Sequence, residues 1–153
     1  MAVVQGNFVT TLVSGTASIV NAQTRYFGDV ARQTEQTIEN IERLIAPQNF
    51  ARHGMPGAGA MLRDIAKVRV YVKNRADYEK CREVCERRLP RVPAIYLQAD
   101  ICRPDLLVEI EAVAFSPFII LHGLSSVHTF DDNIRHDRPT QRVPDLAEVP
   151  ADM

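Results

Sequence analysis

The sequence has no long apolar run and no excess of charge, and each shortage excludes a class of protein. The run "FIIL" at 118–121 has four residues, whereas a membrane-spanning helix needs about 20. The net charge of −1 gives no general attraction to nucleic acid or to an anionic membrane. We therefore expect no membrane segment and no nucleic-acid partner.

Cysteine is also scarce, with three residues in the chain. The number is odd, and no apolar leader segment stands at the N-terminus, so we predict a reduced, cytoplasmic protein without a disulfide framework. Cys81 and Cys85 are four residues apart, as metal ligands on a helix can be. No further Cys or His stands at a supporting spacing, and we expect both thiols to be packed in the core instead.

One local basic cluster does occur, in the stretch "CERRLPR" that contains Arg87, Arg88 and Arg91. Cations at the C-terminal end of a helix suit its macrodipole. We therefore interpret this cluster as a solvated helix end and not as a nucleic-acid surface.

The 153 residues, 46% of them hydrophobic, suffice for one domain with a sizeable core. Helical spacing of apolar residues predicts a first helix over 28–47, capped by Asp29, and a second helix from Asn74 to Pro90. The predicted buried stripes comprise Val30, Thr34, Ile38, Ile41 and Ile45 in the first helix, and Tyr78, Cys81, Val84, Cys85 and Leu89 in the second.

Strand patterns occupy the remaining regular segments. Residues 7–20 predict two strands joined or bulged near Gly15, and alternation predicts a strand over 64–73. Two more strands are expected over 93–100 and 106–115, and a loop over 47–61. The order β-β-α-β-α-β-β predicts an α+β domain over 1–117, with two helices on one face of a sheet. Residues 118–153 are expected to form an extension, which either contacts a neighbour or is disordered, with a possible edge strand at 118–124.

The last predicted strand carries two carboxylates, Glu109 and Glu111. Because side chains alternate along a strand, both point away from the apolar face that the helices cover. They are either solvated or lie in a covered subunit interface that contains a pocket. A carboxyl group in such an interface loses hydration, which raises its pKa and lets it hold a proton near neutral pH. The pattern alone leaves both interpretations open.

The segments "VSGTASI", "GDVARQTEQTIENIERLI", "KVRVYVKNRADYEKCREVCERRL" and "LLVEIEAVA", in this order over residues 7–115, resemble the RidA/YjgF superfamily. The resemblance implies a RidA/chorismate-mutase-like sheet with two helices on one face, and a barrel-like homotrimer with pockets between subunits. The imine deaminases of this superfamily bind the substrate carboxylate through the arginine of a "PAR" motif. This chain has "PAI" there, and Ile95 cannot form that bidentate pair.

The chorismatase branch of the superfamily is more similar, through "SGTASIV", "GDV" and "ICR…DLLVEIE". Chorismatases release pyruvate from the enol ether of chorismate. The resemblance implies that Glu109 matches their catalytic glutamate and that Arg82 matches an arginine of their pocket. Cys102 and Gly15 match residues of the subtype that makes 3-hydroxybenzoate. Chorismatases also have an N-terminal half of similar size, which helps to enclose the substrate. In this chain, neighbouring subunits or the C-terminal tail would enclose the substrate instead.

The resemblance therefore predicts a chorismatase-like lyase that acts on chorismate or a related enol-pyruvyl acid. Glu109 protonates the terminal methylene, Arg82 anchors a carboxylate, and Cys102 shapes the reaction site. The pocket lining is expected to comprise Ser14, Gly15, Tyr96 and Gln98. No metal and no organic cofactor is implied.

Two alternatives remain at this stage. One is an enamine or imine deaminase whose carboxylate anchor lies elsewhere, and the other is a non-catalytic trimer that binds a small molecule. Arg82 also has a simpler interpretation, as a surface arginine paired with Glu79 or Glu86 at helical spacing.

Overall fold

The computed structural model describes residues 1–119. A five-stranded sheet has the order β1-β2-β7-β5-β6. Its neighbouring strands are antiparallel except β5 and β6, which are parallel. The strands of this sheet are β1 (Ala2–Gln5), β2 (Phe8–Ala17), β5 (Ile65–Val72), β6 (Ala94–Gln98) and β7 (Val108–Pro117). A small separate hairpin consists of β3 (Ile19–Val20) and β4 (Gln23–Thr24).

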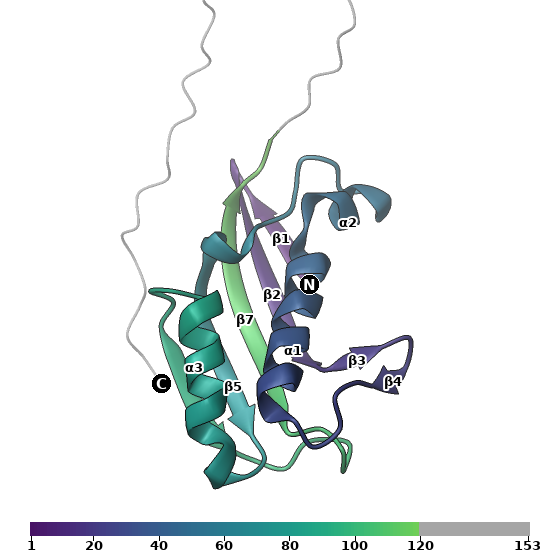
Figure 1. The fold of residues 1–153 in the computed structure, drawn as a ribbon. Coiled ribbons are helices and arrows are strands. Elements are labelled where there is room, and N and C mark those ends of the chain that lie inside the picture. The colour runs from purple at the N-terminus through teal and green to yellow at the C-terminus, as the bar shows by residue number, and fades with distance from the viewer. Residues whose placement is uncertain (120–153) are drawn as a thin grey trace, which may run out of the picture. The chain divides into compact units, whose positions relative to one another are not determined.

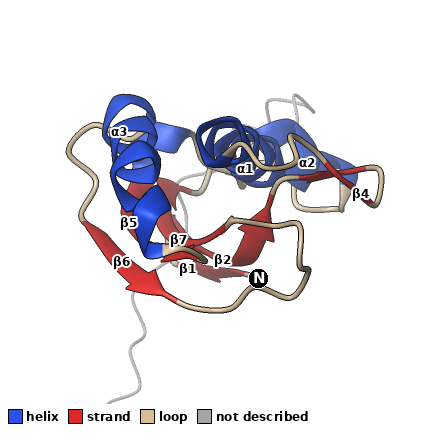
Figure 2. Ribbon diagram, turned by 60° about the horizontal axis from the view of Figure 1, so that its bottom comes forward, coloured by secondary structure: helices blue, strands red, loops and turns tan. Residues whose placement is uncertain are grey.

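Two helices, α1 (Val30–Ile45) and α3 (Tyr78–Arg88), cover one face of this sheet (Figures 1 and 2). We call this the helix face. Within residues 1–119 no helix covers the opposite face, which we call the open face. The predicted α+β architecture, with both helices on one side, is confirmed.

The core lies between the helices and the helix face. Asp29 caps α1, and its side chain accepts a hydrogen bond from the backbone N–H of Arg32 at 3.0 Å. The apolar stripe predicted for α1 is buried, with Ile38 and Ile45 fully inaccessible to solvent. Burying one such side chain contributes about 1.5–3 kcal/mol. The stripe packs on strand residues that point to the helix face, among them Val68, Val70, Val72, Ile110 and Ala112.

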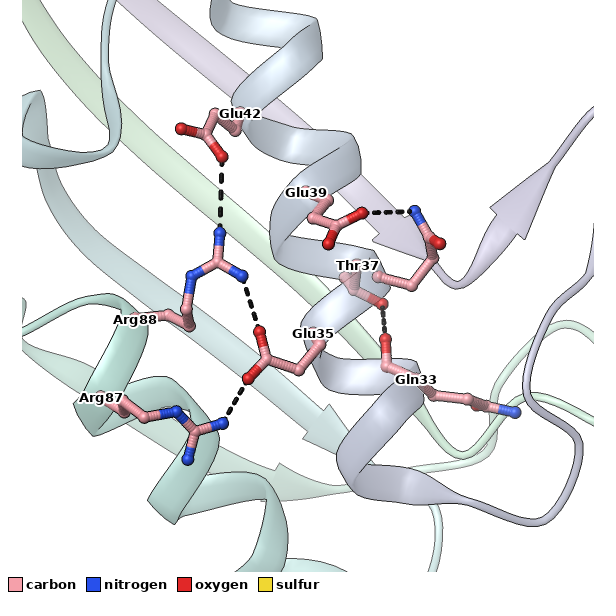
Figure 3. Close-up of polar contacts among 8 residues, drawn as sticks. Gln33, Glu35, Thr37, Glu39, Glu42, Arg87 and Arg88 are labelled. Carbon is pink, nitrogen blue, oxygen red and sulfur yellow. Dashed lines mark hydrogen bonds and ion pairs between the residues drawn. The ribbon is translucent and has the colours of Figure 1, made fainter.

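Ion pairs join the outer sides of the two helices (Figure 3). Arg87 and Arg88 both bind the carboxylate of Glu35, with Arg88 Nη1 at 2.6 Å from Glu35 Oε2. Arg88 also reaches Glu42 at 3.4 Å. Burial raises the pKa of Glu35, but the hydrogen bonds from the two arginines outweigh it and hold the pKa below its usual value. The basic cluster was thus incompletely interpreted, because two of its arginines join α3 to α1.

Two predicted segments differ from the structure. The expected loop over 47–61 contains α2 (Pro47–Arg52), which starts at Pro47 because proline suits the first turn of a helix. The second main helix begins at Tyr78, after a 3₁₀ turn over Arg75–Asp77. Asn74 donates to Asp77 Oδ2 at 2.9 Å within that turn and does not cap the helix.

The first strand was not predicted, because β1 is short and, within residues 1–119, lies at the edge of the sheet and pairs only with β2. The expected tail from residue 118 and the possible strand at 118–124 lie outside the described residues, apart from Phe118 and Ile119. The domain boundary at 117 stays a prediction. In the described part of the chain, no helix has the length and apolar character that a bilayer crossing requires.

Candidate functional site

The strand β7 alternates between the two faces as its sequence predicts. Val108, Ile110 and Ala112 are buried in the core. Glu109 and Glu111 are half-buried and lie on the open face. The candidate acid is therefore on the side of the sheet that no helix covers.

Two rows of side chains cross the open face, because paired residues of neighbouring strands point the same way. In one row Arg69 of β5 is paired with Glu111, and Ile95 of β6 lies on its other side. In the next row Tyr71 is paired with Glu109. The two carboxylates thus have different neighbours.

Glu111 is held by two partners. Arg69 Nε lies 3.2 Å from Glu111 Oε2, and the Tyr71 hydroxyl donates to the same oxygen at 3.1 Å. Glu109 has no hydrogen-bond or ion-pair partner among residues 1–119. The fixed carboxylate suits a supporting role, and the free one suits contact with a ligand.

A bulge in β2 makes room for the free carboxylate. Val13 is paired with Ala112 and Thr16 with Ile110, so β2 carries one extra residue beside β7. The Thr16 hydroxyl donates to the Ser14 carbonyl at 3.0 Å inside this bulge. A Cβ atom on Gly15 would lie 1.8 Å from Glu109 Oε1. The absence of a side chain at Gly15 is what allows Glu109 to take its observed position.

Ser14, on the same bulge, borders a hollow of about 380 Å³ on the open face. Its polar lining comprises Ser14, Lys67, Arg69 and Glu111, and its apolar lining comprises Met1, Leu12, Val13, Ala112 and Val113. The structure therefore brings Ser14, Gly15 and Glu109 to one region of the molecule.

The other predicted binding residues lie on the helix face. Arg82 is on α3, where it pairs with Glu79 at 3.1 Å and Glu86 at 2.6 Å, and these bonds raise the pKa of its guanidinium. The ion pairs of the simpler interpretation are therefore present. Arg82 and Tyr96 line a common hollow of about 350 Å³.

Tyr96 also borders a wider hollow of about 1100 Å³, together with Gln98. Its ring packs edge-on against Tyr78, with the ring centroids 5.2 Å apart. Burial, followed by the nearby thiol of Cys85, raises the pKa of Tyr96, so its hydroxyl stays protonated and can donate. Arg82, Tyr96 and Gln98 thus form a second group, separated from Glu109 by the sheet.

Cys102 is exposed in the loop between β6 and β7. Its neighbour Ile101 packs with Leu106 and with Ala17, the residue of β2 that is paired with Glu109. The loop therefore lies at the end of the sheet that carries the candidate acid.

Sequence reasoning missed Gln33, which fixes this loop. Its side chain is fully buried and donates to the carbonyls of Tyr26 and Asp105 at 3.2 and 2.9 Å. It also accepts from the N–H of Leu107 at 2.8 Å. The available signal was the position of Gln33 next to the predicted buried stripe. A side-chain amide that is buried needs hydrogen-bond partners, so this position indicates that Gln33 bonds to another part of the chain.

Arg69 and Tyr71 were also missed as site residues. The available signal was the alternation over residues 64–73, which predicts that both side chains lie on the face of the sheet away from the core. Cys81 and Cys85 are buried, as predicted, and the described residues contain no group of three or more His, Cys, Asp or Glu arranged to hold a metal ion.

Comparison with known proteins adds sequence relatives to this geometry. The family model described as "Endoribonuclease L-PSP" matches residues 1–116. A chorismatase from Streptomyces rapamycinicus is 46% identical over 102 residues, which are 66% of this chain and 30% of the relative. A 3-hydroxybenzoate synthase from Streptomyces hygroscopicus is 42% identical over 102 residues, with the same shares.

A solved structure is similar as well. The crystal structure of a chorismatase superposes with a TM-score of 0.66 at 37% identity, over 69% of this chain and 32% of that one. The resemblance predicted from the sequence is confirmed. The chain spans about 30% of the length of the curated chorismatase relatives.

Proposed function

The chain belongs to the endoribonuclease L-PSP family, the family of the RidA and YjgF proteins, and on this premise we propose that it is a chorismatase-like lyase. Its substrate is chorismate or a related enol-pyruvyl acid, and its products are pyruvate and a hydroxybenzoate-type acid. The observation that carries the proposal is the carboxylate of Glu109, which has no partner among residues 1–119 and lies in the space beside Gly15.

In this proposal Glu109 supplies the proton. Protonation of the terminal methylene of an enol ether creates an oxocarbenium-like carbon. A water oxygen adds to this carbon and loses a proton, and the resulting hemiketal breaks its bond to the ring oxygen, which takes up a proton, so that pyruvate leaves. Loss of one water from the remaining ring diol then gives the hydroxybenzoate-type acid. Glu111 cannot serve equally well, because Arg69 and Tyr71 occupy its carboxylate. Cys102 shapes the place where the nucleophile approaches.

We further propose that the open face is covered by other copies of the chain in a homotrimer. Large apolar side chains remain exposed there in one copy, including Phe115 at 53% and Ile95 at 59%. Because Arg82 and Glu109 lie on opposite sides of one sheet, a shared site needs residues from two subunits. A trimer would bring Arg82, Tyr96 and Gln98 of one subunit toward Glu109 of another.

The test is to incubate the purified protein with chorismate and, separately, with freshly generated 2-aminoacrylate. Pyruvate and an aromatic hydroxyacid formed from chorismate support the lyase. Ammonia released from 2-aminoacrylate faster than in buffer, without chorismate turnover, would replace the lyase by a deaminase. If neither substrate is converted, the proposal fails in favour of a small-molecule-binding protein.

A further inference from the structure

The hollow at Ser14 and Arg69 on the open face has the features of an anion site. Two of its lining side chains, Lys67 and Arg69, are cations, and one, Glu111, is an anion. The lining therefore has an excess of positive charge at neutral pH. A small anion entering the hollow would be attracted by this excess and would neutralise it.

Arg69 has bonding capacity left for such an anion. Its Nε lies 3.2 Å from Glu111 Oε2. Within residues 1–119 its two terminal nitrogens have no hydrogen-bond partner. The side chain is 53% exposed in one copy of the chain, so a ligand that enters the hollow can contact these nitrogens. A guanidinium that is fixed at one nitrogen presents the others in a set direction, which suits a planar carboxylate.

The rest of the hollow favours an organic acid over a bare inorganic anion. Part of its lining is apolar, with Leu12 and Val113 of the open face among the lining residues. Ser14 also lines the hollow, and a serine hydroxyl can donate a further hydrogen bond. A ligand with one carboxylate and an apolar body would match both parts.

We infer that this hollow binds the carboxylate of a small, partly apolar organic acid, with Arg69 as the anchor and Lys67 as a second cation. Arg69 and Glu109 stand in adjacent rows of the sheet, on paired strands. Diagonal neighbours of this kind are about 7–8 Å apart at their Cα atoms. One small acid could therefore contact Arg69 with its carboxylate and present its other end to Glu109.

The identification of this acid as the enol-pyruvyl substrate rests on the proposed function, but the anion site does not. The probe is therefore a simple one, benzoate, with neutral benzamide as its matched control. Binding is followed by amide chemical shifts in ¹H–¹⁵N spectra of the full chain. We expect benzoate to shift the amides of Ser14 and Val113, and benzamide to leave them unchanged.

Two substitutions of the same ion pair should act in opposite directions. Arg69→Met removes the anchor and should weaken benzoate binding by about tenfold or more. Glu111→Gln keeps the size and removes the competing negative charge, so it should strengthen binding. Arg63→Met, at an arginine 77% exposed just before β5, is the control and should change nothing.

A purely structural ion pair gives a different pattern, in which both substitutions weaken binding or neither matters. Either pattern, or equal shifts with benzamide, overturns the inference. If Arg69→Met fails to fold, Arg69→Lys and Glu111→Gln decide the question in the same titration. Chorismate turnover is measured separately: benzoate binding without turnover refutes only the lyase, and turnover without benzoate binding refutes only this site.

Discussion

The carboxylate of Glu109 occupies the space that a side chain at Gly15 would need. A Cβ atom there would lie 1.8 Å from Oε1 and 2.7 Å from Cδ of Glu109. The two residues come from neighbouring strands, and the bulge of β2 brings them together. The position of the candidate acid therefore depends on the lack of a side chain at Gly15.

Gly15→Ala should change activity more than stability. The atom in the way is the end of a flexible side chain, so Glu109 can rotate aside while the backbone stays in place. We expect a melting temperature close to that of the wild type, together with reduced or redirected chorismate turnover. Thermal unfolding and product analysis check the two halves of this prediction.

Gly59→Ala is the matched control. At Gly59 a Cβ atom would lie 2.5 Å from the Cα atom of Pro47, and φ is +121°. Backbone atoms cannot move aside as a side chain can, so this variant should lose about 2 kcal/mol of stability. Equal destabilisation by both substitutions would contradict the different roles of the two glycines.

Glu109→Gln should abolish turnover of chorismate. The amide keeps the size of the side chain but has no proton to give, and losing a general acid costs about a hundredfold or more in kcat. The variant should keep the oligomeric state of the wild type. A rate within a few-fold of the wild type would remove Glu109 from the mechanism.

Cys102→Ala should alter the products instead of the rate. The thiol is exposed in a loop, and we assign it no bond-forming step. We expect the ratio of aromatic products, separated by liquid chromatography, to shift while pyruvate release continues. An unchanged product ratio would mean that the Cys102 side chain does not influence how the oxygen nucleophile approaches.

Phe115→Lys should dissociate the proposed trimer. Phe115 is 53% exposed and lies on the open face, where a charged side chain would be buried against a neighbour. Light scattering after size exclusion should then give the mass of one chain instead of three. Phe27→Lys is the control, because Phe27 is 70% exposed in the turn before α1. A wild-type protein with the mass of a monomer would refute the trimer directly.

Glu35 should make the fold sensitive to acid. Its pKa is below the usual value of 4.5 in the folded chain, so the ion pairs with Arg87 and Arg88 contribute their full stability above that value. The contribution is lost as the pH falls from 4.5 through the folded pKa. Glu35→Gln should therefore cost about 1 kcal/mol at pH 7 and nothing once the wild-type carboxyl is protonated.

Urea unfolding in a series of buffers from pH 7 down through the acidic range measures this difference. Glu83→Gln serves as control, because Glu83 is an exposed glutamate of α3 with no ion pair among residues 1–119. A loss of stability that stays the same throughout the series would show that the effect is not electrostatic.

Most of the fold follows from periodicity. The stripe of α1 and the alternation of β5 and β7 are long patterns in which many residues agree, and the structure confirms them. α2 was missed because Pro47 can end one helix or start another, and only the packing of the chain decides. The edge strand β1 has four residues, too few for a pattern.

The site was harder to predict. Alternation assigned Glu109 to the open face correctly, but Tyr96 and Gln98 were expected near it and lie on the helix face. The register of the parallel pair β5–β6 decides this point, and it depends on contacts far apart in sequence. Among residues 1–119 Glu111 has partners and Glu109 has none. This difference also depends on the neighbouring strand, which no local pattern reveals.

The side-chain amide of Gln33 has a consequence for how this protein can diversify. It holds the chain at Asp105 and Leu107, immediately before β7 begins. Changes of length or composition between Asp100 and Arg103 would not displace the strand that follows, because the hydrogen bonds from Gln33 hold the chain between that loop and β7. The surroundings of Glu109 are thus free to vary while its carboxylate stays where it is.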